Sequence, residues 1–367
     1  MRDLIIGGAG RLGGRVSVAL AALALLAGGA AIAGCGGSGK SGTTLTIGGW
    51  GGVIDEATQK AYLNQFDSQT GTKSQFVDAP GVQLARVEAQ NAAHQVQWDA
   101  VDSLDGGSAF TLYAKGQLLP LPAAQRASFE SELGAQKVTP FGFSHGSLGD
   151  VIVCNTEKMK SCPSDMAQFY DTKAFPQPRM FGGIEPIEAI TTAEVAAGIP
   201  IAHTATTPVD VKAVLKTLEA LKPYIKVFWQ SGDQQQQIIR SGQVPLGIMW
   251  SDRAYQLISQ GVKLKVVWAG GAYEPSYWAV VKSGHNAALA SRLLTFIASH
   301  PRSQATWAEI VHDSVPNPRA LGYLPASIAS QLADNPVNLK QLATPNFTWY
   351  AQHSEELNTA YENFLRG

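Results

Sequence analysis

A regular alternation of strand-like and helix-like patterns over residues 44–102 constrains the fold of this chain more than any other feature. Three short apolar runs alternate with two segments of helical periodicity, in the order 44–48, 55–67, 74–77, 82–94 and 98–102. Within the first helical segment, Ala57, Ala61 and Phe66 lie on one apolar stripe, and Gly71 follows as a stop signal. This β-α-β-α-β order predicts an open, mainly parallel α/β sheet.

The same mixture of elements continues towards the C-terminus. We expect helices at 208–221, 234–241, 253–260 and 287–300, and strands at 244–249, 264–268 and 278–281. The run Asp105-Gly106-Gly107-Ser108 is typical of a turn after the third strand. With 37 Gly and 19 Pro among 367 residues, the composition suits a loop-rich α/β chain rather than a helical bundle, and the length suggests two domains.

The charge composition argues against a nucleic-acid-binding protein. The chain has 28 Lys and Arg against 29 Asp and Glu, and its basic residues form no cluster that would bind phosphates. Three Cys are too few for a disulfide scaffold or a Cys-rich metal protein, and the seven His lack the paired spacing of zinc ligands. We therefore expect no metal site and no cofactor.

The first 42 residues have the pattern of an export and anchoring signal. Basic residues precede an uncharged apolar run at 16–33, which is typical of a signal peptide. The run ends in Ile32-Ala33-Gly34-Cys35, which resembles a bacterial lipobox, and a Gly/Ser tether follows it. We expect a signal peptide at 1–34, lipidation of Cys35 and a tether at 35–42. The protein would then be lipid-anchored on the periplasmic or extracellular face of a membrane; an uncleaved membrane-spanning anchor is the alternative.

Three enzyme motifs occur outside the context that they need. Residues 8–13 fit G-x-G-x-x-G, but no acidic residue follows before Asp55 to bind a ribose. Residues 34–41 fit G-x-x-x-x-G-K-S, although a tether and a strand follow where a P-loop requires a helix. Residues 142–146 fit the G-x-S-x-G motif of hydrolases, but strand-like sequence follows Ser144. We expect Ser144 in a loop, and no nucleotide site.

Cys154 and Cys162 are the two thiols that remain once Cys35 is lipidated. An exported chain meets an oxidising compartment, where two thiols eight residues apart can form a disulfide. We expect this bond, with two buried free thiols as the alternative.

Two tryptophans are placed where α/β proteins bind ligands. Trp50 follows the first strand and Trp250 follows the strand at 244–249, and each is followed by Gly, Ser or Asp rather than by apolar residues. Ligands of open α/β sheets bind beyond the carboxyl ends of the strands. The two indoles therefore favour a ligand cleft over a purely structural role.

Sequence stretches along most of the chain resemble periplasmic polyamine-type (spermidine and putrescine) binding proteins of ABC importers. The likeness covers most of residues 44–365 and rests on the order and spacing of its pieces, among them Trp50-Gly51-Gly52, Phe169-Tyr170-Asp171, Leu221-Lys222-Pro223, Trp229-Gln230-Ser231-Gly232, Tyr277-Trp278-Ala279-Val280 and Pro316-Asn317-Pro318-Arg319.

The resemblance implies a type II periplasmic-binding-protein fold, in which two α/β lobes enclose a ligand cleft and close around the solute. Lobe 1 would hold residues 43–148 and 276–316, and lobe 2 residues 149–275 and 317–367, with crossing strands at 151–155 and 276–281. The chain would be a monomeric binding protein rather than an enzyme, and it would deliver its solute to a membrane permease.

The resemblance also implies a set of ligand-binding residues. Relatives that bind spermidine or putrescine hold the methylene chain between aromatic rings and the ammonium ends with carboxylates. Trp250 matches the family's tryptophan, and Glu185 and Glu188 fall near its paired acids, whereas Ser276 stands where those relatives have Asp and Cys154 replaces their Tyr. The implied set is Trp50, Gly51, Gly52, Asp105, Glu185, Trp250, Asp252, Glu274, Ser276 and Tyr277.

We expect the ligand to be a small cationic amine of polyamine type, because an enclosed ammonium needs carboxylates and aromatic faces. The alternatives are another small polar solute (a sugar, an amino acid or an anion), a secreted hydrolase, and a structural lipoprotein without a ligand. Ferric-ion binders of this superfamily use adjacent tyrosines, and none of the ten Tyr here are adjacent. Glu188 and Asp252 would also suit ordinary helix starts.

Overall fold

The protein is described here by a computed structural model, which covers residues 43–184 and 186–366. In these residues the strands form two five-stranded sheets. The first sheet has the order β2-β1-β3-β10-β4 and consists of β1 (Thr44–Gly49), β2 (Lys73–Asp78), β3 (Ala100–Asp105), β4 (Gly142–Ser144) and β10 (Ser276–Val280). Strand β1 runs parallel to β2 and β3, whereas β10 is antiparallel to β3 and β4.

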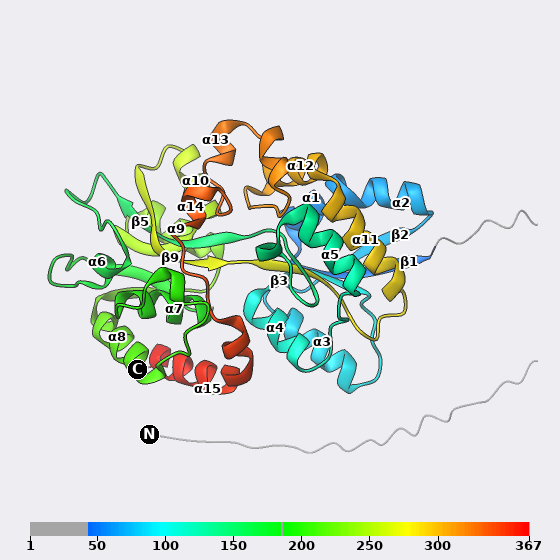
Figure 1. Ribbon diagram of the computed structural model, residues 1–367. Coiled ribbons are helices and arrows are strands. Elements are labelled where there is room, and N and C mark those ends of the chain that lie inside the picture. Colours follow the sequence, from blue (N-terminus) through cyan, green and yellow to red (C-terminus); the bar gives the residue numbers. More distant parts are fainter. Residues whose placement is uncertain (1–42, 185, 367) are drawn as a thin grey trace, which may run out of the picture. The chain divides into compact units, whose positions relative to one another are not determined.

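Helices cover both faces of the first sheet (Figure 1): α1 (Gly52–Thr58), the π-helical η1 (Gln59–Leu63), α2 (Asn64–Thr70), α3 (Gln83–Ala92), α4 (Gly106–Ala114), α5 (Ala123–Leu133), α11 (Ala287–Ser299) and α12 (Pro301–Val311). Side chains alternate between the two faces along each strand. On β10, Trp278 and Val280 point into the core beneath α11 and α12, while Tyr277 and Ala279 point into the core beneath α3 and α4.

The second sheet has the order β7-β6-β8-β5-β9, with β5 (Leu148–Asn155), β6 (Arg179–Gly182), β7 (Ile225–Trp229), β8 (Leu246–Trp250) and β9 (Leu264–Glu274). Strand β6 is parallel to β7 and β8, and β5 is antiparallel to β8 and β9. Its helices are α6 (Met166–Tyr170), α7 (Pro186–Ala196), α8 (Val211–Leu221), α9 (Gly232–Ser241), α10 (Ser251–Ser259), α14 (Pro336–Leu339) and α15 (Phe347–Arg366). The remaining short helices are α13 (Ala326–Ala329), η2 (Ala135–Lys137), η3 (Ile201–His203), η4 (Lys222–Tyr224) and η5 (Pro318–Tyr323).

The chain passes between the sheets through short segments that lie side by side. Strand β4 ends at Ser144 and β5 begins at Leu148, and a single residue separates β9 from β10. Backbone hydrogen bonds join Ser147 to Ser314 in both directions, at 2.9 and 3.3 Å. These crossings hold the two sheets together at one edge of each.

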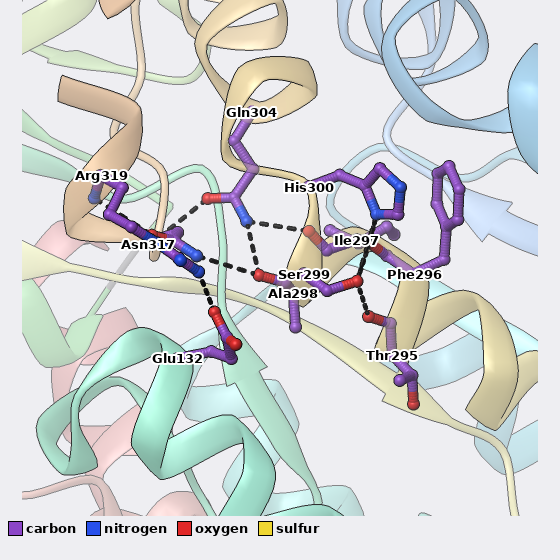
Figure 2. A network of polar contacts seen from close by, with 10 residues as sticks. All are labelled: Glu132, Thr295, Phe296, Ile297, Ala298, Ser299, His300, Gln304, Asn317 and Arg319. Atoms are coloured by element: carbon purple, nitrogen blue, oxygen red, sulfur yellow. Dashed lines mark hydrogen bonds and ion pairs between the residues drawn. The ribbon is translucent and has the colours of Figure 1, made fainter. Parts of the chain in front are cut away.

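Buried amides hold the segment that follows α12 on the first sheet's side of the molecule (Figure 2). Asn317 is fully buried. Its Nδ2 donates to the Ala298 carbonyl oxygen at 3.1 Å, and its backbone N–H donates to Gln304 Oε1 at 2.9 Å. Further along, Ala320, Leu324 and Leu332 belong to the first sheet's core. Residues 317–332 therefore pack with the first sheet, which differs from the lobe division expected from the sequence.

The remaining differences from the sequence expectations are local. Asp105 is the N-cap of α4 and accepts the Ser108 N–H at 2.8 Å, so the expected turn at 105–108 is the beginning of a helix. Ser144 is the last residue of β4 rather than part of a loop, and β5 follows it where a nucleophile elbow requires a helix. The strand expected at 264–268 continues to Glu274, and helix α15 was not expected at all.

A disulfide joins Cys154 on β5 to Cys162, and the Cα atoms of the two residues lie 5.8 Å apart. Across residues 43–184 and 186–366, no helix combines the length and apolarity needed to span a membrane. In the same ranges, no group of three or more His, Cys, Asp or Glu residues could hold a metal ion.

Candidate functional site

A pocket of about 900 Å³ lies where strands of both sheets end and helices begin. On the first sheet's side its walls include Trp50 after β1 and Asp105 before α4. On the second sheet's side they include Ile184 after β6, Gln230 after β7 and Trp250 at the end of β8. The pocket therefore occupies the position at which open α/β sheets bind ligands, beyond the carboxyl ends of their parallel strands.

Trp250 forms part of a rigid aromatic wall. Its ring packs edge-on against Trp229 at a centroid distance of 5.4 Å, and the Trp229 Nε1–H donates to the Ile248 carbonyl oxygen at 2.9 Å. The Trp250 backbone N–H donates to the buried Gln235 side chain. Gly232 leaves the room that this wall requires, because a Cβ on it would lie 3.2 Å from the Trp250 ring. Packing thus presets the orientation of this indole.

The described residues of the pocket wall carry more acidic than basic side chains. The acids are Glu88, Asp105, Glu188, Asp233, Glu355 and Glu362, and the bases are Lys115 and Arg253. Lys115 forms an exposed ion pair with Glu88 at 2.5 Å. Burial raises the pKa of Asp105 above its usual range, even though it accepts a hydrogen bond from Ser108. Such a lining favours a ligand that brings positive charge.

Helix α15 supplies a whole wall of the pocket, although we did not expect this helix from the sequence. Residues Tyr350, Ser354, Glu355, Asn358, Tyr361, Glu362 and Leu365 line the pocket, at the spacing of one helix face. The Tyr361 hydroxyl donates to the Gly182 carbonyl oxygen at 2.6 Å, which fixes the helix to the second sheet. The only available signal was the helical periodicity of residues 347–366, which gives no indication of a binding face.

The first turn of α15 also packs against α4 of the first sheet's side (Figure 1). The Phe347 ring stacks on Phe110 at a centroid distance of 5.5 Å. Gly106 and Gly107 at the start of α4 admit this contact, because a Cβ on Gly107 would lie 2.9 Å from the Tyr350 ring and one on Gly106 would clash with Phe347. One helix therefore links both sides of the molecule beside Asp105.

The structure brings three of the sequence-predicted site residues, Trp50, Asp105 and Trp250, together on the pocket wall. Gly51 is the N-cap of α1 and Gly52 its first residue, with φ of 96° and 59°, a region that favours glycine. The Gly51 N–H donates to Asp55 Oδ1 at 2.9 Å. Glu185 and Cys35 lie outside the described residues.

Four other predicted site residues are absent from the pocket lining. Ser276 is the strand partner of Asp105, and Tyr277 is buried against Phe141. Glu274 is buried at the end of β9. Asp252, in the first turn of α10, is buried and forms an ion pair with Arg253 at 3.3 Å. None of these four is part of the pocket lining.

Asp252 and Asp313, which follows α12, form a small buried acidic cluster. Burial raises the pKa of both carboxyl groups, and the charge of Asp252 raises the pKa of Asp313 further. The charge of Arg253 opposes this effect at Asp252. Arg253 is thus the link between this cluster and the pocket, since it lines the pocket itself.

Comparisons with known proteins agree with this geometry. The family model described as "Bacterial extracellular solute-binding protein" matches residues 61–341. The gamma-aminobutyric acid-binding protein of Pseudomonas aeruginosa is 26% identical over 330 residues, which are 87% of this chain and 90% of that protein. The solved Atu4243–GABA receptor has a TM-score of 0.79 and 26% identity, over 88% of this chain and 97% of that one.

A structure of the spermidine/putrescine-binding protein PotD from Streptococcus pneumoniae has a TM-score of 0.68 over 88% of this chain and 99% of that one. Its sequence identity is 18%, so this likeness shows the shared fold alone. The architecture is therefore the two-lobed α/β fold of periplasmic binding proteins.

Proposed function

The chain belongs to the bacterial extracellular solute-binding protein family, and we propose that it captures a small amine-bearing solute for an ABC importer. The coarser role, as the substrate-binding component of an ABC transporter for a small solute, comes with the family and its relatives. That the solute bears an amine goes beyond this role and is our own proposal. The observation that carries it is the acidic pocket wall, in which six carboxylate side chains face two basic ones among the described residues.

The physical reason is the cost of removing an ammonium group from water. An enclosed ammonium loses several kcal/mol of hydration unless carboxylates or aromatic faces replace the water. Glu188 supplies a buried acidic side chain at the pocket, Asp105 supplies a half-buried one, and Trp50 and Trp250 supply indole rings. A cation over an indole contributes about 0.5–2 kcal/mol. The polyamine-type resemblance and the relatives named for gamma-aminobutyric acid both concern ligands with an ammonium group.

We further propose that capture proceeds by hinge closure of two lobes. Residues 43–147 and 276–332 form one lobe, and residues 148–275 and 336–366 form the other, according to the sheet or core with which each segment packs. Closure about short crossings such as those at Ser147 and Ser314 is the usual motion of binding proteins of this class. The closed form would then present the solute to the permease.

Export and lipid anchoring complete the proposal, and they rest on the sequence of the first 42 residues. Substitution Cys35→Ala should release the protein from membranes into the soluble fraction, because the acylated residue is lost. Fractionation followed by immunoblotting measures this, with wild type as the control. A Cys35→Ala protein that stays membrane-bound at unchanged mass would indicate an uncleaved apolar anchor instead.

Isothermal titration calorimetry against amines, sugars, amino acids and inorganic anions tests the ligand class. We expect amines to bind. We expect Trp250→Ala to lower their affinity roughly 2- to 30-fold, which is equivalent to the loss of one cation–indole contact. Trp349→Ala is a matched control, because this tryptophan stacks on His353 of α15 and is not part of the pocket lining. Tight binding of a sugar or anion without any amine would refute the proposal. Silence in all four classes would favour a structural lipoprotein.

A further inference from the structure

Arg253 places a guanidinium in a pocket wall that is otherwise mainly acidic. It is the third residue of α10, directly after the end of β8, and its side chain is about a quarter exposed. Gly232 makes room for it, since a Cβ there would lie 2.6 Å from Arg253 Nε. The guanidinium is thus packed beside Gly232, as the Trp250 ring is. Lys115, by contrast, belongs to an exposed ion pair.

The protein contacts of Arg253 hold its inner side. Nε lies 3.3 Å from Asp252 Oδ2, and Nη1 donates to Gln256 Oε1 at 3.4 Å. Both distances are long for charge-assisted contacts, which are about 2.7–2.9 Å. A guanidinium has five N–H donors in a planar fork. Within the parts of the chain that the structure covers, the side-chain hydrogen bond and ion pair of Arg253 therefore involve Nη1 and Nε only.

The counter-charge of Arg253 is shared with buried acids. Asp252 is buried and interacts with the buried Asp313, and burial raises the pKa of both carboxyl groups. His312 is a further charged neighbour of Asp252 and acts in the same direction as Arg253. A carboxyl that is hard to ionise neutralises an arginine incompletely. A ligand carboxylate in the pocket would supply the missing charge.

We infer that the solute carries an anionic group, most simply a carboxylate, which Arg253 binds while the acidic side chains bind its ammonium group. This inference rests on the proposed amine function and sharpens it. Arginine suits the role because its fork matches the two oxygens of a carboxylate. A polyamine has cationic groups at both ends, so one of them would meet the guanidinium of Arg253. The ligand class is therefore amino acids with separated charges, and polyamines are excluded.

Calorimetry with three probes of equal carbon number tests the inference on the full-length protein: 4-aminobutyrate, putrescine and butyrate. The first has both charges, the second only ammonium groups, and the third only the carboxylate. We expect wild type to bind 4-aminobutyrate at least 100-fold more tightly than either of the others. Amino acids, diamines and carboxylates of three to six carbons extend each class if the pocket prefers another length.

Variants at Arg253 assign the carboxylate contact. Arg253→Gln should lower the affinity for 4-aminobutyrate about 100-fold without lowering the affinity for putrescine. Arg253→Lys should retain part of the affinity for 4-aminobutyrate. Arg126→Gln is the control and should change affinity less than 3-fold, because that arginine lies outside the pocket lining and forms an exposed ion pair with Glu130. Thermal unfolding checks that each variant is folded. If Arg253→Gln does not fold, the probe ranking on wild type still decides.

The outcomes separate this inference from the proposed function. Diamines that bind more tightly than amino acids, with Arg253→Gln leaving them unchanged, would overturn the inference and keep the amine proposal. Carboxylates that bind as tightly as the amino acids, and lose affinity in Arg253→Gln, would overturn the amine proposal and keep the role of Arg253. Absence of binding across all three classes would overturn both.

Discussion

A buried ion pair at the crossing between the two sheets offers a sharp test of the structure. Lys137, from η2, pairs with Asp334 of the segment before α14, and both side chains are only 7% exposed. Lys137 Nζ also donates to the Tyr273 hydroxyl at 2.9 Å. That hydroxyl lies 2.8 Å from Asp334 Oδ1 and 2.9 Å from Ser147 Oγ. Residues as far apart as Lys137, Tyr273 and Asp334 therefore meet at one polar cluster.

Substitution Lys137→Met should lower the free energy of unfolding by about 3–5 kcal/mol, because it leaves Asp334 buried without its counter-charge. This corresponds to a roughly 100- to 5,000-fold change in the unfolding equilibrium constant. The double variant Lys137→Met/Asp334→Leu removes both charges and should return to within about 1 kcal/mol of wild type. The lone Lys115→Met control, at an exposed ion pair, should cost less than about 1 kcal/mol.

Urea unfolding, followed by both tryptophan fluorescence and far-UV circular dichroism, measures these free energies, and coincident transitions validate the two-state treatment. A Lys137→Met cost no larger than that of Lys115→Met would refute the reasoning. A double variant as unstable as the single one would also contradict it, since the loss would then come from packing rather than from an unpaired charge.

Three further predictions concern other parts of the fold. Burial raises the pKa of Asp102 to about 7, so the folded state binds the proton more strongly than the unfolded state, and this residue should make wild type lose stability as the pH rises from about 4 to 7. Asp102→Asn should reduce this dependence of stability on pH. Denaturation curves of both proteins at pH 5 and 8 measure it, and an equal loss of stability between these pH values in wild type and Asp102→Asn would contradict the reasoning. Replacing Cys154 and Cys162 by Ala should cost about 2–3 kcal/mol, because the unfolded chain regains the freedom of a short loop; equal unfolding midpoints for oxidised wild type and the variant would disprove this. Gly106→Ala should destabilise the protein by about 1–3 kcal/mol, because the new methyl meets the Phe347 ring, and a Phe347→Ala background should remove most of that penalty; additive losses in a double-mutant cycle would count against the contact.

The sequence predicted the local elements well because local elements depend on local patterns. The strands at Thr44–Gly49, Lys73–Asp78 and Leu246–Trp250 begin and end within two residues of their expected bounds. Alternating apolar residues such as those of β10 pack on two faces, as period-2 geometry requires. The turn expected at 105–108 was wrong because Asp105 and two glycines suit a helix start as well as a turn.

Of the site residues expected from the sequence, Trp50, Asp105 and Trp250 lie on one pocket wall, whereas others do not. Trp50 and Trp250 line the pocket because the ends of parallel strands converge at one edge of each sheet. Asp252, beside Trp250 in sequence, is absent from the pocket lining because it is buried next to Asp313, which is 61 positions away. Its neighbour Arg253 lines the pocket instead. Which of two adjacent residues faces a cavity depends on the packing of remote segments.

The sequence alone determined the alternation of strands and helices, the position of the two tryptophans at strand ends and the resemblance to a family, because each depends on patterns among residues that are close in the sequence. Tertiary structure decided that α15 forms a pocket wall and that residues 317–332 pack with the first sheet. It also joined Lys137 to Asp334 across 197 positions of the chain. The pattern of an amphipathic helix shows which of its faces is apolar but not which segment that face packs against. Contacts between residues far apart in the sequence form only when folding brings those segments together.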